Sequence, residues 1–143
     1  MSMWDSFTAS ARRSVQLANG EAQRAGEASW QVPEYLLLGI LAAAEGAPAE
    51  ALRELGLELE PLRRQVDLVR GAAKHSTRED TKRFKRVIER AFREGRRHAS
   101  PRIDTTHLLL GIAAERRGGV AKVLELSGTS RNALEFRVNA IAR

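Results

Sequence analysis

The sequence contains no cysteine, and only 5% of its residues are aromatic. Without cysteine the chain can form no disulfide framework, thiolate metal site or cysteine nucleophile. Its three histidines, His75, His98 and His107, are too scattered for a zinc site. No apolar run approaches the roughly 20 residues that a membrane span needs. These absences leave one globular domain of 143 residues as the expectation, with no metal and no membrane.

The chain also lacks the short motifs of common enzyme classes. There is no GxxxxGK[ST], GxSxG or HExxH, and Glu115–Gly119 is interpreted only as a turn between helices. Thr106 and His107 are adjacent, so on a helix their side chains diverge by about 100°. We therefore predict no catalytic residue and no cofactor. The first five residues lack the charged and apolar regions of a signal peptide, so the cytoplasm is the expected compartment.

Charge is unevenly distributed along the chain. Residues 1–72 hold seven Lys or Arg against ten Asp or Glu, whereas residues 73–143 hold seventeen against eight. The overall net charge of +6 therefore combines an acidic half with a basic half. This asymmetry suggests two structural units.

An internal repeat confirms that division at the level of sequence. The stretch LLLGI at residues 36–40 recurs at 108–112, and an offset of 72 gives 12 identities over residues 34–70. Upstream the offset becomes 73 and matches Thr8 with Thr81 and Glu21 with Glu94. We predict one domain over 1–143, with a first repeat at about 4–70, a linker at 71–80 and a second repeat at about 81–143.

Each repeat is predicted to contain four helices. Apolar residues between 84 and 95 recur at i, i+3, i+4, i+7 spacing, which indicates an amphipathic helix, and its counterpart is expected over about 7–25. Pro33 fits the first position of the next helix, and Asp104 or Thr105 can cap its equivalent. The third helices are expected at about 47–55 and 119–126, and the fourth at about 59–69 and 130–142.

Gly39 and Gly111 lie inside the second helix of each repeat, where glycine costs roughly 1 kcal/mol relative to alanine. The same cost at both positions indicates close approach of two helices. Strand signals are weak. The predicted fold class is all-α: a tandem, pseudo-twofold repeat of two four-helix units, eight helices in all, around one core.

Two surface features could carry function. The helix at 81–97 carries a basic face, and its cations are Lys82, Arg83, Lys85, Arg86, Arg90, Arg93, Arg96 and Arg97. This face is either simply solvated, or binds an acidic protein surface, or binds the phosphates of nucleic acid. Trp4, Phe7 and Trp30 either cover the edge of the core or form the aromatic rim of a peptide groove.

These pieces together resemble the N-terminal domain of the Clp protein-unfolding ATPases ClpC and ClpA, which is a tandem of two four-helix repeats. The matching segments are Phe7-Thr8, the run from Pro33 to Ile40 and the run from Thr105 to Ile112. The resemblance covers nearly the whole chain. It implies a domain without ATPase chemistry that recruits substrates and adaptor proteins to an unfoldase.

The resemblance also implies two phosphoarginine sites, each made by the threonine before the first helix and the glutamate of the second helix. Carried onto this sequence, site one uses Thr8 and Glu34, and site two uses Thr81 and Thr106. Because Thr106 stands where the family has glutamate, the second site lacks its carboxylate. Cyclic-peptide antibiotics are further implied ligands.

The predicted function is thus a non-enzymatic binding module of the Clp protease system. Its expected partners are Clp components, adaptors or arginine-phosphorylated substrates. The Met-Ser-Met start and the departures from the family motif favour a free-standing adaptor or decoy over a piece of an ATPase. The alternative is a nucleic-acid-binding protein that uses the basic face at 81–97.

Overall fold

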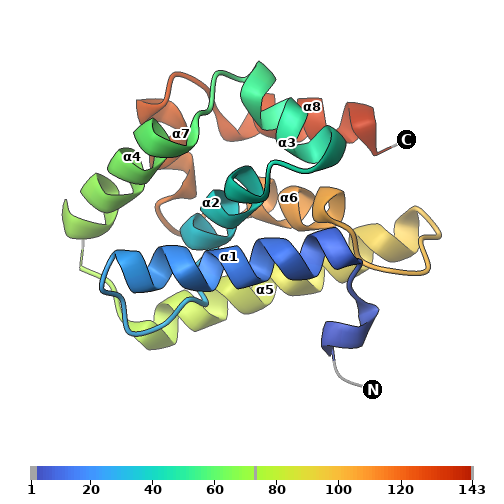
Figure 1. The fold of residues 1–143 in the computed structure, drawn as a ribbon, viewed down its shortest axis with the longest axis horizontal. Coiled ribbons are helices and arrows are strands. Elements are labelled where there is room, and N and C mark those ends of the chain that lie inside the picture. The colour runs from blue at the N-terminus through green and yellow to red at the C-terminus, as the bar shows by residue number, and fades with distance from the viewer. Residues whose placement is uncertain (1–2, 73, 143) are drawn as a thin grey trace.

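The computed structural model describes residues 3–72 and 74–142, and every regular element in that part of the chain is helical (Figure 1). A short 3-10 helix, η1 (Met3–Ser6), precedes eight α-helices, which confirms the all-α prediction. Their bounds are α1 (Ala9–Arg24), α2 (Pro33–Ala43), α3 (Gly46–Glu54), α4 (Leu59–Ala72), α5 (Thr77–Arg97), α6 (Thr105–Ala114), α7 (Val120–Leu126) and α8 (Arg131–Ile141).

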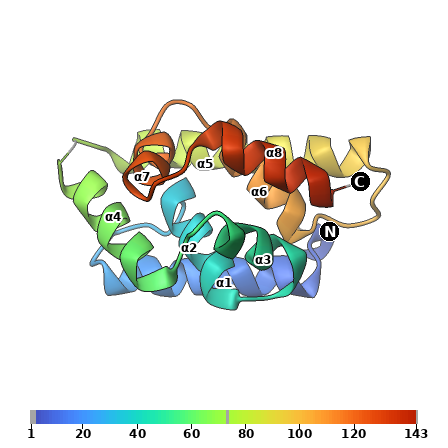
Figure 2. The ribbon, with the colours of Figure 1, turned by 90° about the horizontal axis from the view of Figure 1, so that it is seen from above.

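The helices form three layers. The long helices α1 and α5 lie along one face, α2 and α6 lie in the middle, and the remaining four cover the other side (Figure 1). Seen from above, α1–α4 and α5–α8 lie side by side as two similar halves (Figure 2). One cluster of buried apolar side chains runs through both halves. The two repeats therefore share a core.

Within each repeat, the first two helices approach each other closely at an internal glycine. A Cβ on Gly39 would lie 2.2 Å from the carbonyl oxygen of Ser14 in α1. A Cβ on Gly111 would lie 2.4 Å from the carbonyl oxygen of Val87 in α5. These distances confirm the predicted close approach, and they show that α1–α2 and α5–α6 are the same packed pair.

The segment predicted as a linker is mostly helical. α4 runs on to Ala72, and α5 begins at Thr77, four residues before the predicted start. The reason is a cap: the side chain of Ser76 accepts a hydrogen bond from the backbone N–H of Glu79 at 3.1 Å, and acidic residues in the first turn suit the helix dipole. Within 71–80, only residues 74–76 of the described chain lie outside these two long helices.

No single helix among the described residues is both long and apolar enough to cross a membrane. α2 and α3 together reach the length and apolar composition of a membrane span, but they are bent by 105° against each other. Most of α2 is buried inside the domain, as an apolar core helix is.

We predict that Gly39→Ala destabilises the domain by about 2 kcal/mol, because the new methyl group must push the α1 backbone away. Gly20→Ala is the matched control, since Gly20 also lies inside a helix, α1, and a Cβ there has nothing within 4 Å. It should stabilise the domain by about 0.5–1 kcal/mol through helix propensity. Urea unfolding measures both, and equal effects at the two positions would contradict the close contact.

Candidate functional site

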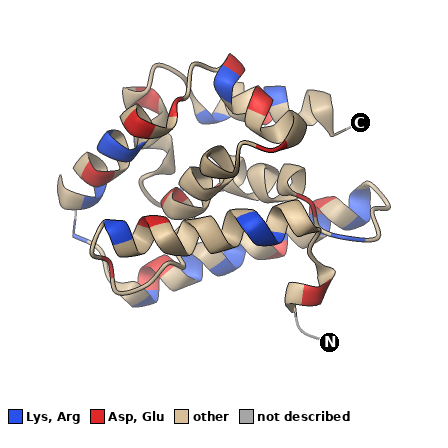
Figure 3. Ribbon diagram, viewed as in Figure 1, with Lys and Arg blue, Asp and Glu red and all other residues tan. Residues whose placement is uncertain are grey.

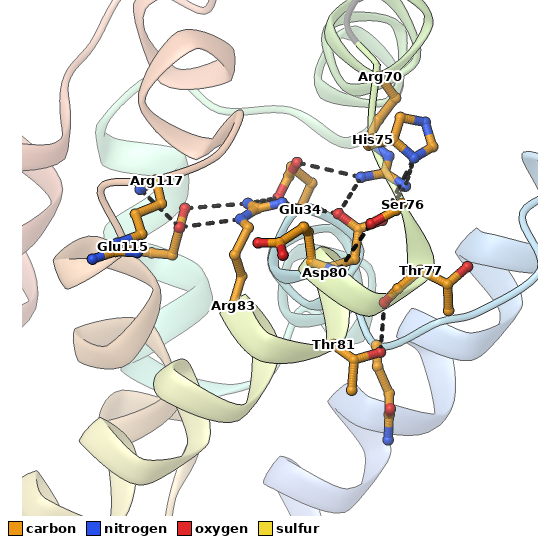
Figure 4. Close-up of polar contacts among 12 residues, drawn as sticks. Glu34, Arg70, His75, Ser76, Thr77, Asp80, Thr81, Arg83, Glu115 and Arg117 are labelled. Atoms are coloured by element: carbon orange, nitrogen blue, oxygen red, sulfur yellow. Dashed lines mark hydrogen bonds and ion pairs between the residues drawn. The ribbon is translucent and has the colours of Figure 1, made fainter.

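A buried arginine joins the two repeats at one end of the domain. Arg83, in α5, donates from Nη2 to Glu34 Oε1 in α2 at 2.5 Å. It also donates from Nε and Nη2 to the two carboxylate oxygens of Glu115 at 3.1 Å each (Figure 4). Glu34 is 1% exposed, and Arg83 and Glu115 are both 7% exposed. One guanidinium therefore bridges the first turn of α2 and the residue that follows α6.

A second arginine extends this ionic network. Arg70, in the last turn of α4, donates to both carboxylate oxygens of Asp80 at 3.0 Å. It also donates from Nε to Glu27 at 2.9 Å, and its guanidinium lies 5.7 Å above the ring of Tyr35. His75 Nδ1 lies 3.1 Å from Arg70 Nη2. These contacts attach α4 to the beginning of α5.

The network holds more acid than base. Four carboxylates, those of Glu27, Glu34, Asp80 and Glu115, face two guanidinium groups. Burial alone would lower the pKa of Arg83, but its hydrogen bonds and proximity to the carboxylates outweigh burial and raise that pKa. The same balance raises the pKa of Arg70. No group of three or more His, Asp or Glu with a metal-binding arrangement occurs among residues 3–72 and 74–142.

Above the network lies a cleft of about 990 Å³, bounded by α4, the start of α5 and α7. Its apolar wall includes Leu68 and Leu126, which are 59% and 42% exposed. Gly118 and Gly119 leave room for its floor: a Cβ at Gly118 would overlap the Arg83 guanidinium at 1.8 Å, and one at Gly119 would lie 3.0 Å from Glu34 Oε2. The turn after α6 is therefore part of this site.

The structure does not bring Thr8 and Glu34, the predicted residues of site one, together. Thr8 caps the start of α1 and donates to Asp104 Oδ1 at 2.9 Å. Glu34 lies near Glu27, beyond the other end of α1, because Arg70 contacts both carboxylates. α1 has 16 residues and is about 24 Å long. The prediction paired two residues of the same repeat, whereas the observed contacts of Thr8 with Asp104 and of Glu34 with Arg83 run between repeats.

Thr81 and Thr106, the predicted pair of site two, also lie apart. Thr81 is inside α5 rather than at its cap, and its hydroxyl donates to the Thr77 carbonyl at 2.8 Å (Figure 4). Thr106 is in the first turn of α6 and is half-buried. α5 packs against α6 with Arg83 beside Glu115, so the start of α5 lies at the far end of α6 from Thr106.

The three predicted rim aromatics do not form one groove. Phe7 is only 1% exposed and belongs to the core. Trp4 lies against Phe7, which in turn contacts Phe92 in the second half of α5. Trp30 instead packs edge-to-face on Phe84 in the first half of α5, at 5.2 Å. The two tryptophans therefore cover separate edges of the core.

The predicted basic face of α5 is present (Figure 3). Most of its cations are exposed to solvent and Arg90 is half-buried: Lys82, Lys85, Arg86, Arg90, Arg93, Arg96 and Arg97. Arg83 is the exception, because its side chain points into the buried network. It is a structural cation rather than part of a docking face.

Sequence reasoning missed Arg70, Asp80, Arg83 and Glu115 as site residues. Two of them carry a signal in the helical spacing. Arg70 continues the buried series of Leu62 and Val66, and Arg83 lies four residues before buried Val87. A charged residue in the apolar register of a helix needs a buried partner, so it marks an ionic network.

Duplicated helical packing around one core, with a ligand-sized cleft at the junction, defines a helical repeat domain. A family model described as the Clp repeat (R) N-terminal domain matches residues 6–127. The chain belongs to this family.

Two relatives show the extent of the match. The chain is 36% identical over 132 residues to the negative regulator of genetic competence ClpC/MecB of Bacillus subtilis. It is 35% identical over 132 residues to the chaperone protein ClpB of Oceanobacillus iheyensis. In both cases the match includes 91% of this chain but only 16% of the relative. The chain thus corresponds to a small part of each.

Solved structures support the fold. The N-terminal domain of the chaperone ClpD from Arabidopsis thaliana superimposes with a TM-score of 0.80 at 21% identity, covering 96% of this chain and 95% of that one. The Hsp104 N-terminal domain from Candida albicans gives a TM-score of 0.71 at 14% identity, covering 94% and 90%. At these identities the likeness concerns the fold alone.

We predict that Arg83→Gln lowers the free energy of unfolding by about 3–5 kcal/mol, because Glu34 and Glu115 lose the charge that compensates their burial. Lys85→Gln is the matched control, since Lys85 is exposed on the same helix. It should change stability by less than about 0.5 kcal/mol. Urea unfolding measures both, and a small loss for Arg83→Gln would show that the network contributes little.

At the opposite junction between the repeats, His107 Nδ1 accepts a hydrogen bond from the backbone N–H of Asp104 at 2.9 Å. Burial lowers the pKa of His107, the Asp104 and Glu94 carboxylates oppose this, and His98 reinforces it. Below pH about 6.5 the unfolded chain therefore binds a proton that the folded chain resists. We predict that stability falls as the pH drops through this value towards the lowered pKa of the folded state.

His107→Gln should reduce that pH dependence, because glutamine can keep the cap but does not titrate. The measurement is the urea midpoint at pH 7.5 and at pH 5.5 for both proteins. An identical fall in the two would assign the acid sensitivity to other groups.

Proposed function

We propose that this chain is a non-enzymatic protein-binding module of the Clp system, and that it holds a segment of a substrate or adaptor in the cleft between α4, α5 and α7. The observation that supports this most is the cleft itself. Its volume of about 990 Å³ is at the upper end of the range for small-molecule sites, which suits several side chains of a peptide.

The cleft wall matches a segment that is partly apolar and partly anionic. Leu68 and Leu126 leave apolar surface uncovered, and burying it against a partner is favourable. Lys74, Arg117 and Lys122 also line the cleft and are exposed. An apolar side chain next to a carboxylate or phosphate would meet both parts of the wall.

An arginine-phosphorylated segment is the specific ligand of this proposal. Of the four predicted phosphoarginine residues, Glu34 alone lines the cleft. Its carboxylate already binds the Arg83 guanidinium, so a ligand guanidinium would have to share or replace that partner. The ligand phosphate would then meet the Arg117 and Lys122 side chains. A cyclic peptide antibiotic that carries apolar side chains would compete for the same leucines.

The test measures binding of unmodified and arginine-phosphorylated casein by calorimetry. The double variant Leu68→Ser, Leu126→Ser should weaken binding of both caseins about tenfold or more, because it removes the apolar wall. Phe136→Ser is the matched control: Phe136 is 78% exposed on α8 and does not line the cleft. It should leave binding unchanged.

Two further outcomes separate the general proposal from the phosphoarginine proposal. Glu34→Gln should weaken binding of the phosphorylated casein more than that of the unmodified one, whereas Thr106→Ala should affect neither. An equal loss for both caseins would remove phosphoarginine and leave the protein-binding role. Absence of binding to either casein, or an equal loss with Phe136→Ser, would overturn the cleft as the site.

A further inference from the structure

We propose that a second pocket, between α5 and the turn that joins α6 to α7, binds a compact polyphosphate group. This pocket has a volume of about 330 Å³, and its uncharged lining consists of Val87, Gly111 and Ala114. It shares Arg86 and Arg117 with the larger cleft, and its other lining residues lie outside that cleft.

Five arginines surround this small volume, and they come from two sides. Arg86, Arg90 and Arg93 recur at i, i+4 and i+7 on one face of α5, and Arg116 and Arg117 lie in the turn after α6. Four of them are exposed, and Arg90 is half-buried. Within the described part of the chain, Arg90 pairs with Glu94 at 3.4 Å, while the other four side chains have no ion pair.

The acidic residues of the pocket do not balance these cations. Glu115 is committed to the buried Arg83, and its other contact is the backbone N–H of Arg117. Glu89 is exposed and is the remaining carboxylate that lines the pocket. The site therefore has a local excess of positive charge, which disfavours the free protein and favours an anion.

The first repeat provides an internal control, because Gly39 and Gly111 place the same helix pair in both halves. Positions 86, 90, 93, 116 and 117 correspond to Arg13, Leu17, Gly20, Ala44 and Glu45. There the only cation, Arg13, pairs with Glu45 at 2.9 Å. In the first copy the positive charge of Arg13 is thus neutralised by Glu45. The same helix pair therefore folds without a cluster of arginines. The cluster in the second copy then needs a reason other than folding.

The chemistry of the pocket indicates condensed phosphate. Every cation that lines it is arginine, whose planar fork binds phosphate oxygens in pairs. Five guanidinium groups around about 330 Å³ favour a ligand with a high density of negative charge. A triphosphate places more negative charge in that volume than an acidic peptide does. A volume of about 330 Å³ suits a few linked phosphate groups rather than the width of a DNA duplex.

The test is calorimetric titration of the wild-type chain with sodium tripolyphosphate at low ionic strength, with ATP in a parallel titration. We expect one site per chain. Arg93→Gln combined with Arg116→Gln should weaken binding about tenfold or more. The matched control combines Lys85→Gln with Arg96→Gln, which removes the same charge from exposed positions outside the pocket. It should change the affinity less than threefold, within the effect of overall charge.

The outcomes are distinct. Binding of both tripolyphosphate and ATP supports the site with nucleotides as a source, and binding of tripolyphosphate alone supports it with inorganic phosphate as the source. Equal weakening in the two double variants, no binding, or displacement of tripolyphosphate by equimolar duplex DNA would overturn it. Since Arg93 and Arg116 do not line the larger cleft, casein binding by the first double variant is independent of this result.

Arg117→Glu offers a second measurement, because it restores in the second repeat the pair seen between Arg13 and Glu45. It should abolish tripolyphosphate binding and raise the thermal midpoint at low salt. A fall in that midpoint would show that Arg117 stabilises the fold, and it would remove the argument from charge excess.

Discussion

The position of one guanidinium group determines how the two halves of this domain meet. Arg83 is buried, and in a medium of low polarity its charge is tolerated only with carboxylates in contact. Those carboxylates come from the start of α2 and from the end of α6. The helices cannot shift without leaving a charge unpaired. The walls of the larger cleft, which stand on this network, are therefore held at a defined separation.

The pseudo-twofold axis gives the domain two junctions of this kind, and they use different chemistry. At the first, Glu34 meets a cluster of buried ions. At the second, the backbone of Phe7 pairs with Ile103, and Asp104 caps α6 while accepting from Thr8. Around the second junction, Glu94 Oε2, His98 Nδ1 and Thr105 Oγ1 are buried without a hydrogen-bond partner in the described chain, so its polar groups are satisfied only in part. One duplicated backbone thus produces one ionic site and one structural joint.

This arrangement explains which features the sequence could predict. The repeat, the eight helices and the packing at Gly39 and Gly111 follow from periodicity and from self-similarity, which are local properties. The separation of Thr8 from Glu34 could not be predicted, because contacts between the copies depend on how the halves are rotated against each other, and a sequence offset carries no information on that rotation. The buried Arg83 lay within the predicted basic helix, where only its apolar register distinguishes it from its exposed neighbours.

Comparison of the two copies separates what the backbone needs from what a ligand would need. Positions that pack the core are alike, as in Leu36 with Leu108 and Gly39 with Gly111. The candidate sites instead consist largely of positions where the copies differ: Arg83 corresponds to Ser10, and Arg117 to Glu45. Since Ser10 and Glu45 form a hydrogen bond with each other in the first copy, the shared fold does not require arginine at either place. Arg117 is exposed and lines both hollows, so its charge is available to partners of the domain, whereas the charge of buried Arg83 is compensated by Glu34 and Glu115.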